Sequence, residues 1–228
     1  MISAKNLSVG YGEKTILEHI SFAIPEKSTT VIMGPGGSGK TTILKMLIGT
    51  SIDEELWYTG EFNYPTTPPF FCPQNKSFHP KGSLCEILQE HYPKAKSDNF
   101  LHSVWRSFPD VFASLKKIQK TPLCELPLGT AKLAYLSIAL GNKYPYVILD
   151  EPERYLKFEE QQLLIKKIAE VKTEKTLVIT THNQRFSREV ADFVMLFVYG
   201  ELIECADRDS FFLHPKHDRT KQYLRYGS

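Results

Sequence analysis

The sequence predicts an α/β fold with a mostly parallel core sheet and an N-terminal antiparallel β region. A glycine-rich loop, residues 34–41, lies between a short β-branched apolar run and a run with helical spacing. Two later apolar runs, residues 146–150 and 176–182, each end in polar residues and are typical of buried strands. At the start of the chain, residues 2–9 alternate apolar and polar side chains, and residues 16–24 continue as strands.

The glycine-rich loop fits the pattern G-x-x-x-x-G-K-[ST], which cradles nucleotide phosphates. Glycines let backbone N–H groups approach phosphate oxygens where a Cβ would collide, and the N-terminus of the following helix adds donors. Lys40 supplies a charge to the β- and γ-phosphates, and the Thr41 hydroxyl is expected to ligate Mg²⁺. The alternative is a glycine-rich turn with a surface lysine. The expected nucleotide-binding residues here are Gly34, Pro35, Gly36, Gly37, Ser38, Gly39, Lys40, Thr41 and Thr42.

Length and composition limit the class of protein. The 228 residues predict one large domain or a core with one insertion, and 42% hydrophobic content allows a sizeable core. A net charge of +2 does not indicate a nucleic-acid partner. The four cysteines lack C-x-x-C pairing, which suits a reducing compartment and argues against a structural metal. Residues 1–6 do not resemble a signal peptide, and residues 193–199 are too short to span a bilayer. We therefore expect a soluble protein that reaches a membrane only through a partner.

Two acids follow the strand expected at residues 146–150. An apolar strand that ends in two acids matches the needs of a magnesium–nucleotide site. Asp150 can hold the metal through water, and Glu151 can orient and deprotonate an attacking water. The alternative is a pair of surface acids that cap a strand, which is less common beside a phosphate-binding loop.

Three single residues are weaker candidates. Tyr11 can stack on a purine, Gln74 follows a short apolar strand at residues 70–72, and His182 lies at the polar tip of the strand at residues 176–182. The alternative is that Tyr11 is an ordinary turn tyrosine, that Gln74 is a loop residue and that His182 has a structural role.

The rest of the chain is expected to be mainly helical. Residues 83–120 carry three apolar stripes and predict a helical insertion, and residues 132–140 and 159–171 predict two more helices. A strand is expected to start at residues 60–62, a strand–turn–strand unit at residues 190–204, and a terminal helix in the basic, aromatic tail.

Taken in this order, the motifs resemble those of the nucleotide-binding domain of ABC ATPases, over nearly the whole chain. The matching positions are Tyr11 (A-loop), residues 34–41 (Walker A), Gln74 (Q-loop), residues 146–150 (Walker B), Glu151 (catalytic glutamate) and His182 (switch histidine).

The resemblance implies a P-loop fold of the ABC ATPase type, with one domain over residues 1–228 and a helical subdomain at about residues 75–140. It implies ATP and Mg²⁺ as ligands, with Thr41, Gln74 and Asp150 at the metal. Glu151, His182 and Lys40 are the implied catalytic residues. The implied partners are integral membrane permease subunits and a second nucleotide-binding subunit, identical or different. The implied location is cytoplasmic, at the inner face of the cell membrane.

Two segments depart from the family pattern. The signature Leu-Ser-Gly-Gly-Gln falls on residues 126–130, where Pro127 has neither hydroxyl nor N–H and Leu128 adds a side chain. The D-loop Ser-Ala-Leu-Asp falls on residues 154–157, where Lys157 replaces the aspartate. The half-site used on the chain's own nucleotide is therefore complete, and the half-site offered to a partner is degraded.

The C-terminal residues 200–224 resemble the end of the ATPase subunits of phosphate importers, so phosphate is the expected solute. The altered signature leaves a second hypothesis open, a regulatory nucleotide-binding subunit with little turnover. A third is a soluble ABC ATPase of an assembly machine.

Overall fold

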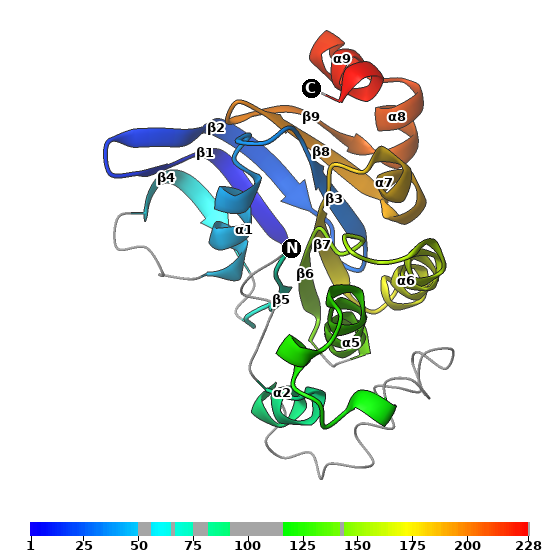
Figure 1. The fold of residues 1–228 in the computed structure, drawn as a ribbon. Coiled ribbons are helices and arrows are strands. Elements are labelled where there is room, and N and C mark those ends of the chain that lie inside the picture. Colours follow the sequence, from blue (N-terminus) through cyan, green and yellow to red (C-terminus); the bar gives the residue numbers. More distant parts are fainter. Residues whose placement is uncertain (50–55, 65–66, 75–81, 92–115, 142–143, 228) are drawn as a thin grey trace.

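The computed structural model describes residues 1–49, 56–64, 67–74, 82–91, 116–141 and 144–227 (Figure 1). Its elements form two sheets with helices around them. The predicted α/β class, with a mixed core sheet and an antiparallel β region, is confirmed.

The core sheet has six strands, of which the first five are parallel and the last is antiparallel to its neighbour. Its β-branched and apolar residues favour buried strands. Strand β3 lies in the centre, so the loop that follows it lies at the middle of one sheet edge. In spatial order the strands are β5 (Phe70–Cys72), β6 (Tyr146–Asp150), β7 (Thr176–Thr180), β3 (Thr29–Met33), β8 (Phe193–Val198) and β9 (Glu201–Asp207).

Alternate residues of the core strands face two different hydrophobic clusters. In β3, Val31 and Met33 pack in one cluster, and Ile32 packs in the other. In β6, Leu149 packs in the same cluster as Val31, and Ile148 packs in the same cluster as Ile32. The sheet is therefore covered on both faces, which explains why its strands are apolar throughout.

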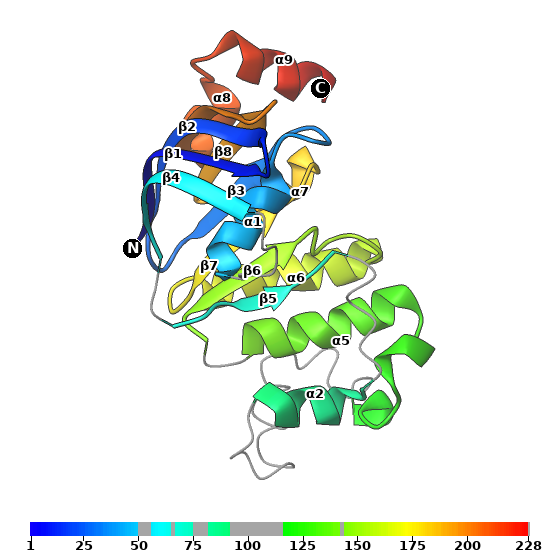
Figure 2. The same cartoon turned by 90° about the vertical axis from the view of Figure 1, so that its left-hand side faces the viewer.

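The second sheet is antiparallel, in the order β2 (Lys14–Ile24), β1 (Ile2–Tyr11) and β4 (Leu56–Asn63). Helix α1 (Lys40–Ile48) packs in one cluster with β1, β2 and one face of the core sheet. Figures 1 and 2 show α1 beside the antiparallel sheet.

The other face of the core sheet is covered by α5 (Leu128–Gly141) and α6 (Phe158–Val171), as Figures 1 and 2 show. Helix α2 (Leu84–His91) lies beyond α5. The remaining helices are η2 (Leu123–Glu125), α7 (Gln184–Val190), α8 (Arg208–Leu213) and α9 (Asp218–Tyr226). No helix within the described ranges is long and apolar enough to cross a bilayer.

Most expected elements are present, with three differences. The strand expected to start at residues 60–62 begins at Leu56, with Gly60 inside it. Two strands expected in residues 16–24 form one continuous strand, β2. Residue 190 was expected to open the strand–turn–strand unit, but it is the last residue of α7, a helix that the sequence did not predict. The apolar stripes expected within residues 92–115 lie outside the described residues.

Candidate nucleotide-binding and hydrolysis site

The glycine-rich loop connects β3 to α1 at the edge of the core sheet. Gly34 has a φ of 146°, and a Cβ there would lie 2.0 Å from the carbonyl oxygen of Phe197. Gly39 has a φ of 97°, and a Cβ there would lie 2.5 Å from the Leu17 side chain. Side chains are therefore excluded at both ends of the loop by conformation and by space.

The start of α1 offers backbone donors to an anion. Gly39 is the N-cap and provides no side-chain cap, and the first turn contains no acidic residue. The N–H groups and the positive end of the helix dipole are thus open to a phosphate. The Thr41 side chain is exposed, whereas Thr42 is buried, so Thr42 presents its backbone to the loop.

Lys40 folds back over the loop. Its Nζ donates to the carbonyl oxygens of Gly34 at 2.6 Å and Pro35 at 2.8 Å. Burial lowers the pKa of Lys40, and the carboxylates of Glu151 and Asp150 oppose that shift. The ammonium therefore lies within reach of both acids at the same sheet edge.

Asp150 is the last residue of β6, next to the end of β7. Its Oδ1 accepts a hydrogen bond from the hydroxyl of Thr180. Burial raises the pKa of Asp150, and this hydrogen bond opposes the rise. A half-buried carboxylate with one anchored oxygen suits a group that meets a cation.

Glu151 is the point where the predicted residues converge. Gln74 donates from Nε2 to Glu151 Oε2, and His182 Nδ1 lies 3.0 Å from Oε1. Arg154 Nη1 donates to Oε2 at 3.1 Å. Burial would raise the pKa of Glu151, but Gln74, His182 and Arg154 together lower it.

The turn after β1 carries the predicted base-stacking residue. Lys45 Nζ lies 5.1 Å from the centroid of the Tyr11 ring, so Tyr11 lies beside α1. The Trp57 indole N–H donates to the carbonyl oxygen of Gly12 at 2.7 Å and holds this turn.

The structure thus brings Gln74, Glu151 and His182 into contact, and the electrostatics link them to Lys40 and Asp150. Within the described residues, no cluster of three or more His, Cys, Asp or Glu side chains forms a ready-made metal cage. A magnesium site here would instead combine few protein oxygens with phosphate oxygens.

Comparisons with known proteins agree with this arrangement. Residues 17–154, more than half of the chain, match the family model described as ABC transporter. The chain belongs to the ABC transporter family. Its enzymatic activity is that of an ABC ATPase, the hydrolysis of ATP coupled to transport.

Curated relatives of this ABC protein include two phosphate import ATP-binding proteins, both named PstB. The protein of Saccharolobus solfataricus is 26% identical over 93% of this chain and 90% of the relative. That of Thermotoga maritima is 26% identical over 98% of this chain and 97% of the relative.

Solved structures share the fold of this ABC protein. An ATP-binding subunit of an ABC transporter superposes with a TM-score of 0.78, 18% identity, and coverage of 100% of this chain and 95% of that chain. A bacterial Atm1-family ABC exporter with ATP bound gives a TM-score of 0.80 and 17% identity. This chain spans 42% of the length of that exporter.

The altered signature of this ABC protein lies at the start of α5. The Pro127 carbonyl accepts from the N–H of Ala131 at 3.0 Å, and Leu128 is 43% exposed. Gly129 packs closely on the altered D-loop, because a Cβ there would lie 2.5 Å from the carbonyl oxygen of Tyr155. The two departures from the family pattern are therefore in contact within one chain.

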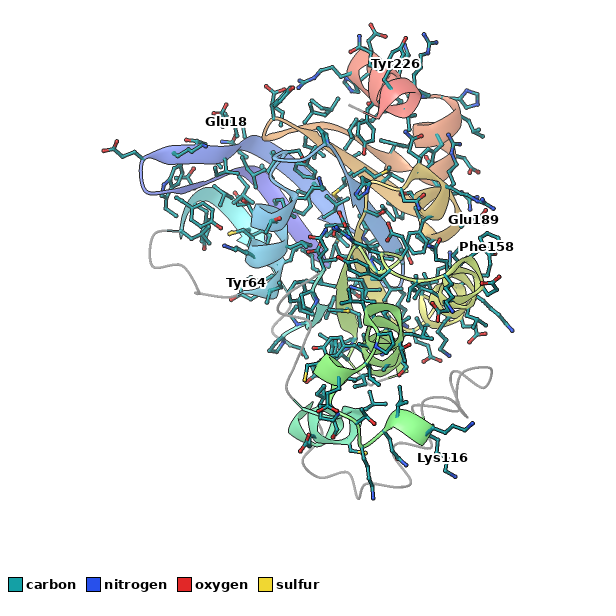
Figure 3. All side chains as sticks on the ribbon, in the orientation of Figure 1. Glu18, Tyr64, Lys116, Phe158, Glu189 and Tyr226 are labelled. Atoms are coloured by element: carbon teal, nitrogen blue, oxygen red, sulfur yellow. The ribbon has the colours of Figure 1, made fainter. Side chains whose placement is uncertain are left out.

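Apolar side chains are exposed around that contact. Tyr155 is 40% exposed and Phe158 is 55% exposed. Phe158 and Glu189 lie at the same edge of the molecule (Figure 3). Both line a shallow open pocket between α6 and α7.

Three site residues were missed from the sequence. Arg154 was noted only as a D-loop replacement, although a cation three residues after a glutamate can pair with it across a turn. Glu153 is buried and accepts from the Thr181 hydroxyl, beside His182. Lys132 is fully buried in α5, and its place in a periodic helix gave no sign of a polar role.

Proposed function

We propose that this chain is the ATP-binding and ATP-hydrolysing subunit of an ABC importer, and that phosphate is the transported solute. The convergence of Gln74 and His182 on Glu151, next to the Lys40 loop, carries the hydrolytic part of the proposal. The curated relatives named as phosphate import proteins support the choice of solute.

In this proposal the loop binds the ATP phosphates and Tyr11 stacks on the base. Backbone N–H groups of residues 34–42 donate to the phosphate oxygens. Lys40 leaves the carbonyls of Gly34 and Pro35, which it contacts in the structure, and donates to the β- and γ-phosphates.

The residues present also fit Mg²⁺. The Thr41 hydroxyl is exposed at the start of α1, and the Asp150 carboxylate lies at the end of β6. Gln74 donates through its nitrogen to Glu151, so its amide oxygen is the atom available to a cation. These hard oxygen donors suit Mg²⁺, which would neutralise charge on the transferred phosphoryl group.

Glu151 acts as the group that positions and deprotonates the attacking water. Its carboxylate is ionised at neutral pH because three donors lower its pKa. His182 is 66% exposed and points to the same carboxylate, so it can reach the γ-phosphate. Arg154 donates to Oε2 and would compete with the water there.

The proposed partners are integral membrane permease subunits and a second nucleotide-binding subunit, which places the chain in the cytoplasm at the inner face of the membrane. The net charge of +2 gives no reason to expect nucleic acid as a partner.

A second candidate is a regulatory subunit that binds ATP with little turnover. The exposed Leu128 and the adjacent Pro127, with Lys157 in the D-loop, favour it. The loss of a few charge-assisted hydrogen bonds at ~1.5–3 kcal/mol each can slow hydrolysis by orders of magnitude.

Steady-state ATPase assays with Mg²⁺ test the enzymatic part. Turnover that Glu151→Gln abolishes, with ATP binding retained, supports the motor. Tight ATP binding without turnover, alone and with candidate partner subunits, supports the regulatory subunit. Uptake of labelled phosphate by proteoliposomes that contain the cognate permease tests the solute, with labelled sulfate as the control.

A further inference from the structure

Lys132 is a buried cation with two backbone acceptors next to candidate catalytic residues. It lies in the second turn of α5 and is fully buried. Its Nζ donates to the carbonyl oxygens of Pro73 at 2.9 Å and Asp150 at 3.3 Å. A buried ammonium is tolerated only when such acceptors replace its lost water.

The two carbonyls occupy equivalent places in the chain. Pro73 directly precedes Gln74, and Asp150 directly precedes Glu151. The side chains of Gln74 and Glu151 contact each other. One ammonium therefore fixes the backbone immediately before both members of the pair.

The charge of Lys132 also acts on the pKa of the Cys72 thiol. Burial raises the pKa of the Cys72 thiol to about 11, and Lys132 opposes that shift. Cys72 ends β5, next to the end of β6. The ammonium thus lies at the point where α5 meets the ends of two parallel strands.

We propose that Lys132 is a positioning residue that couples the signature helix α5 to the Gln74–Glu151 pair. The altered signature lies at the start of α5, one turn before Lys132. A displacement of this end of the helix moves the ammonium, and with it the carbonyls that precede Gln74 and Glu151. The proposal rests on the assignment of Glu151 as the residue that positions water.

A double-mutant cycle tests the coupling. Lys132→Met keeps length and removes the charge, and we expect kcat to fall about 10- to 100-fold, the scale of one or two charge-assisted hydrogen bonds. The KM for ATP should stay within about threefold, because the phosphate-binding loop is unchanged. In a Gln74→Ala background, Lys132→Met should lower kcat by less than about threefold, since the pair is already broken.

Leu136→Ala is the matched control. Leu136 is also fully buried in α5, one turn after Lys132, and its loss weakens packing without removing a polar contact. Its effect on kcat should be equal in the wild-type and Gln74→Ala backgrounds. Full multiplication of the Lys132→Met and Gln74→Ala effects would overturn the proposal.

Hydrogen exchange of the nucleotide-free protein separates this proposal from the proposed function. Backbone amides of residues 70–74 and 146–151, measured relative to other core-sheet amides of the same variant, should exchange about tenfold faster in Lys132→Met than in Leu136→Ala. Only Lys132→Met loses the two carbonyl contacts, whereas the packing loss in Leu136→Ala affects the whole core. Equal exchange in the two variants would reject the positioning role. Failure of the wild-type chain to hydrolyse ATP, both by itself and with candidate partner subunits, would reject the hydrolytic function and would leave the hydrogen-exchange result for Lys132 unaffected.

Discussion

At the residue scale, the Glu151 carboxylate, proposed to position the attacking water, is in contact with three side chains. Gln74 and His182 occupy positions that match the Q-loop and the switch histidine, whereas Arg154 replaces a small polar residue of the family D-loop. Arg154 Nη1 shares Glu151 Oε2 with Gln74. Two donors therefore share the Oε2 atom of Glu151.

Arg154→Gln is expected to release that oxygen and to raise kcat. The arginine side chain is 42% exposed, so the ion pair is worth at most about 1 kcal/mol, and the increase should be up to about fivefold. Steady-state ATPase assays measure it. Arg208→Gln, which removes another exposed ion pair, should leave kcat unchanged. A decrease in the Arg154 variant would mean that the guanidinium helps to hold the carboxylate in place.

At the element scale, the start of α5 decides what this chain offers to a partner's nucleotide. Pro127 has no N–H, and Leu128 is exposed where a glycine would allow close approach. The first turn of α5 is closed by the backbone, because the N–H of Ala131 donates to the carbonyl oxygen of Pro127.

Restoring the two signature residues should raise turnover. The variant with Pro127→Ser and Leu128→Gly regains a hydroxyl and two accessible N–H groups, at ~1.5–3 kcal/mol per charge-assisted hydrogen bond. We expect kcat of the purified chain to increase about 10- to 1,000-fold. Pro127→Ala with Leu128→Ala controls for a change in helix stability. An increase in this control as large as in the restored signature would show that the hydroxyl and glycine are not the cause.

Helix α9 is attached through a carboxylate on β9. Glu204 is 5% exposed and accepts from the N–H groups of Lys216 at 3.0 Å and His217 at 3.3 Å, at the start of α9. Burial would raise the pKa of Glu204, but these donors lower it below its ordinary value of 4.5. The folded state therefore favours the ionised carboxylate.

Glu204 should make stability depend on acidic pH. Its contribution is fully present above the unfolded pKa near 4.5 and is lost as pH falls through the lower folded pKa. Glu204→Gln should lower the unfolding free energy by about 1–3 kcal/mol at pH 7 and flatten its decline below pH 4.5. Urea titrations at several pH values measure both effects. The exposed Glu201→Gln is the control, and an equal loss in both variants would contradict the role of Glu204.

Much of the element pattern was predictable, and the failures have local causes. The strands at residues 29–33, 70–72 and 146–150 are short apolar runs with glycine or proline nearby, and each forms as expected. Helix α7 has seven residues, too few for a visible periodicity, although Asn183 caps it by accepting from Phe186 N–H. The strand expected to start at residues 60–62 begins four residues earlier, because Gly60 lies inside β4 and not at its start.

The sequence predicted which residues form the candidate site, but it did not predict which of their side chains contact one another. A sequence orders Gln74, Glu151 and His182 along the chain, and only the parallel packing of β5, β6 and β7 brings their ends together. Lys132 was unpredictable because a lysine in a helix is ordinarily solvated, and its burial follows from the way α5 packs on β5.

At the scale of the whole molecule, the proposed function combines a complete nucleotide-binding half-site with a degraded half-site for a partner. The nucleotide-binding half-site lies in the β3–α1 loop, whereas the half-site for a partner lies at the start of α5. Two identical copies would therefore carry the same fault in both composite sites, whereas a partner with an intact signature would complete this chain's own site.

Association measurements distinguish these assemblies. With Glu151→Gln to block turnover, the chain should remain monomeric in ATP and Mg²⁺, because each lost charge-assisted hydrogen bond weakens closure about tenfold or more. The same variant with Pro127→Ser and Leu128→Gly should dimerise, and Lys40→Ala should prevent this. Sedimentation velocity measures the two states. Strong ATP-dependent dimerisation of the unrestored chain would show that its signature still closes on nucleotide.

Gly129 remains where the family signature also has a glycine, and a reader of the sequence would take it as a relic of ATP binding. Its close approach to the Tyr155 carbonyl supplies a different reason. A chain released from selection for nucleotide contact at this loop can change its serine and first glycine freely, but this glycine must persist as long as the loop folds. The presence of Gly129 is explained by its packing against the D-loop, so it is not evidence that this loop still contacts nucleotide.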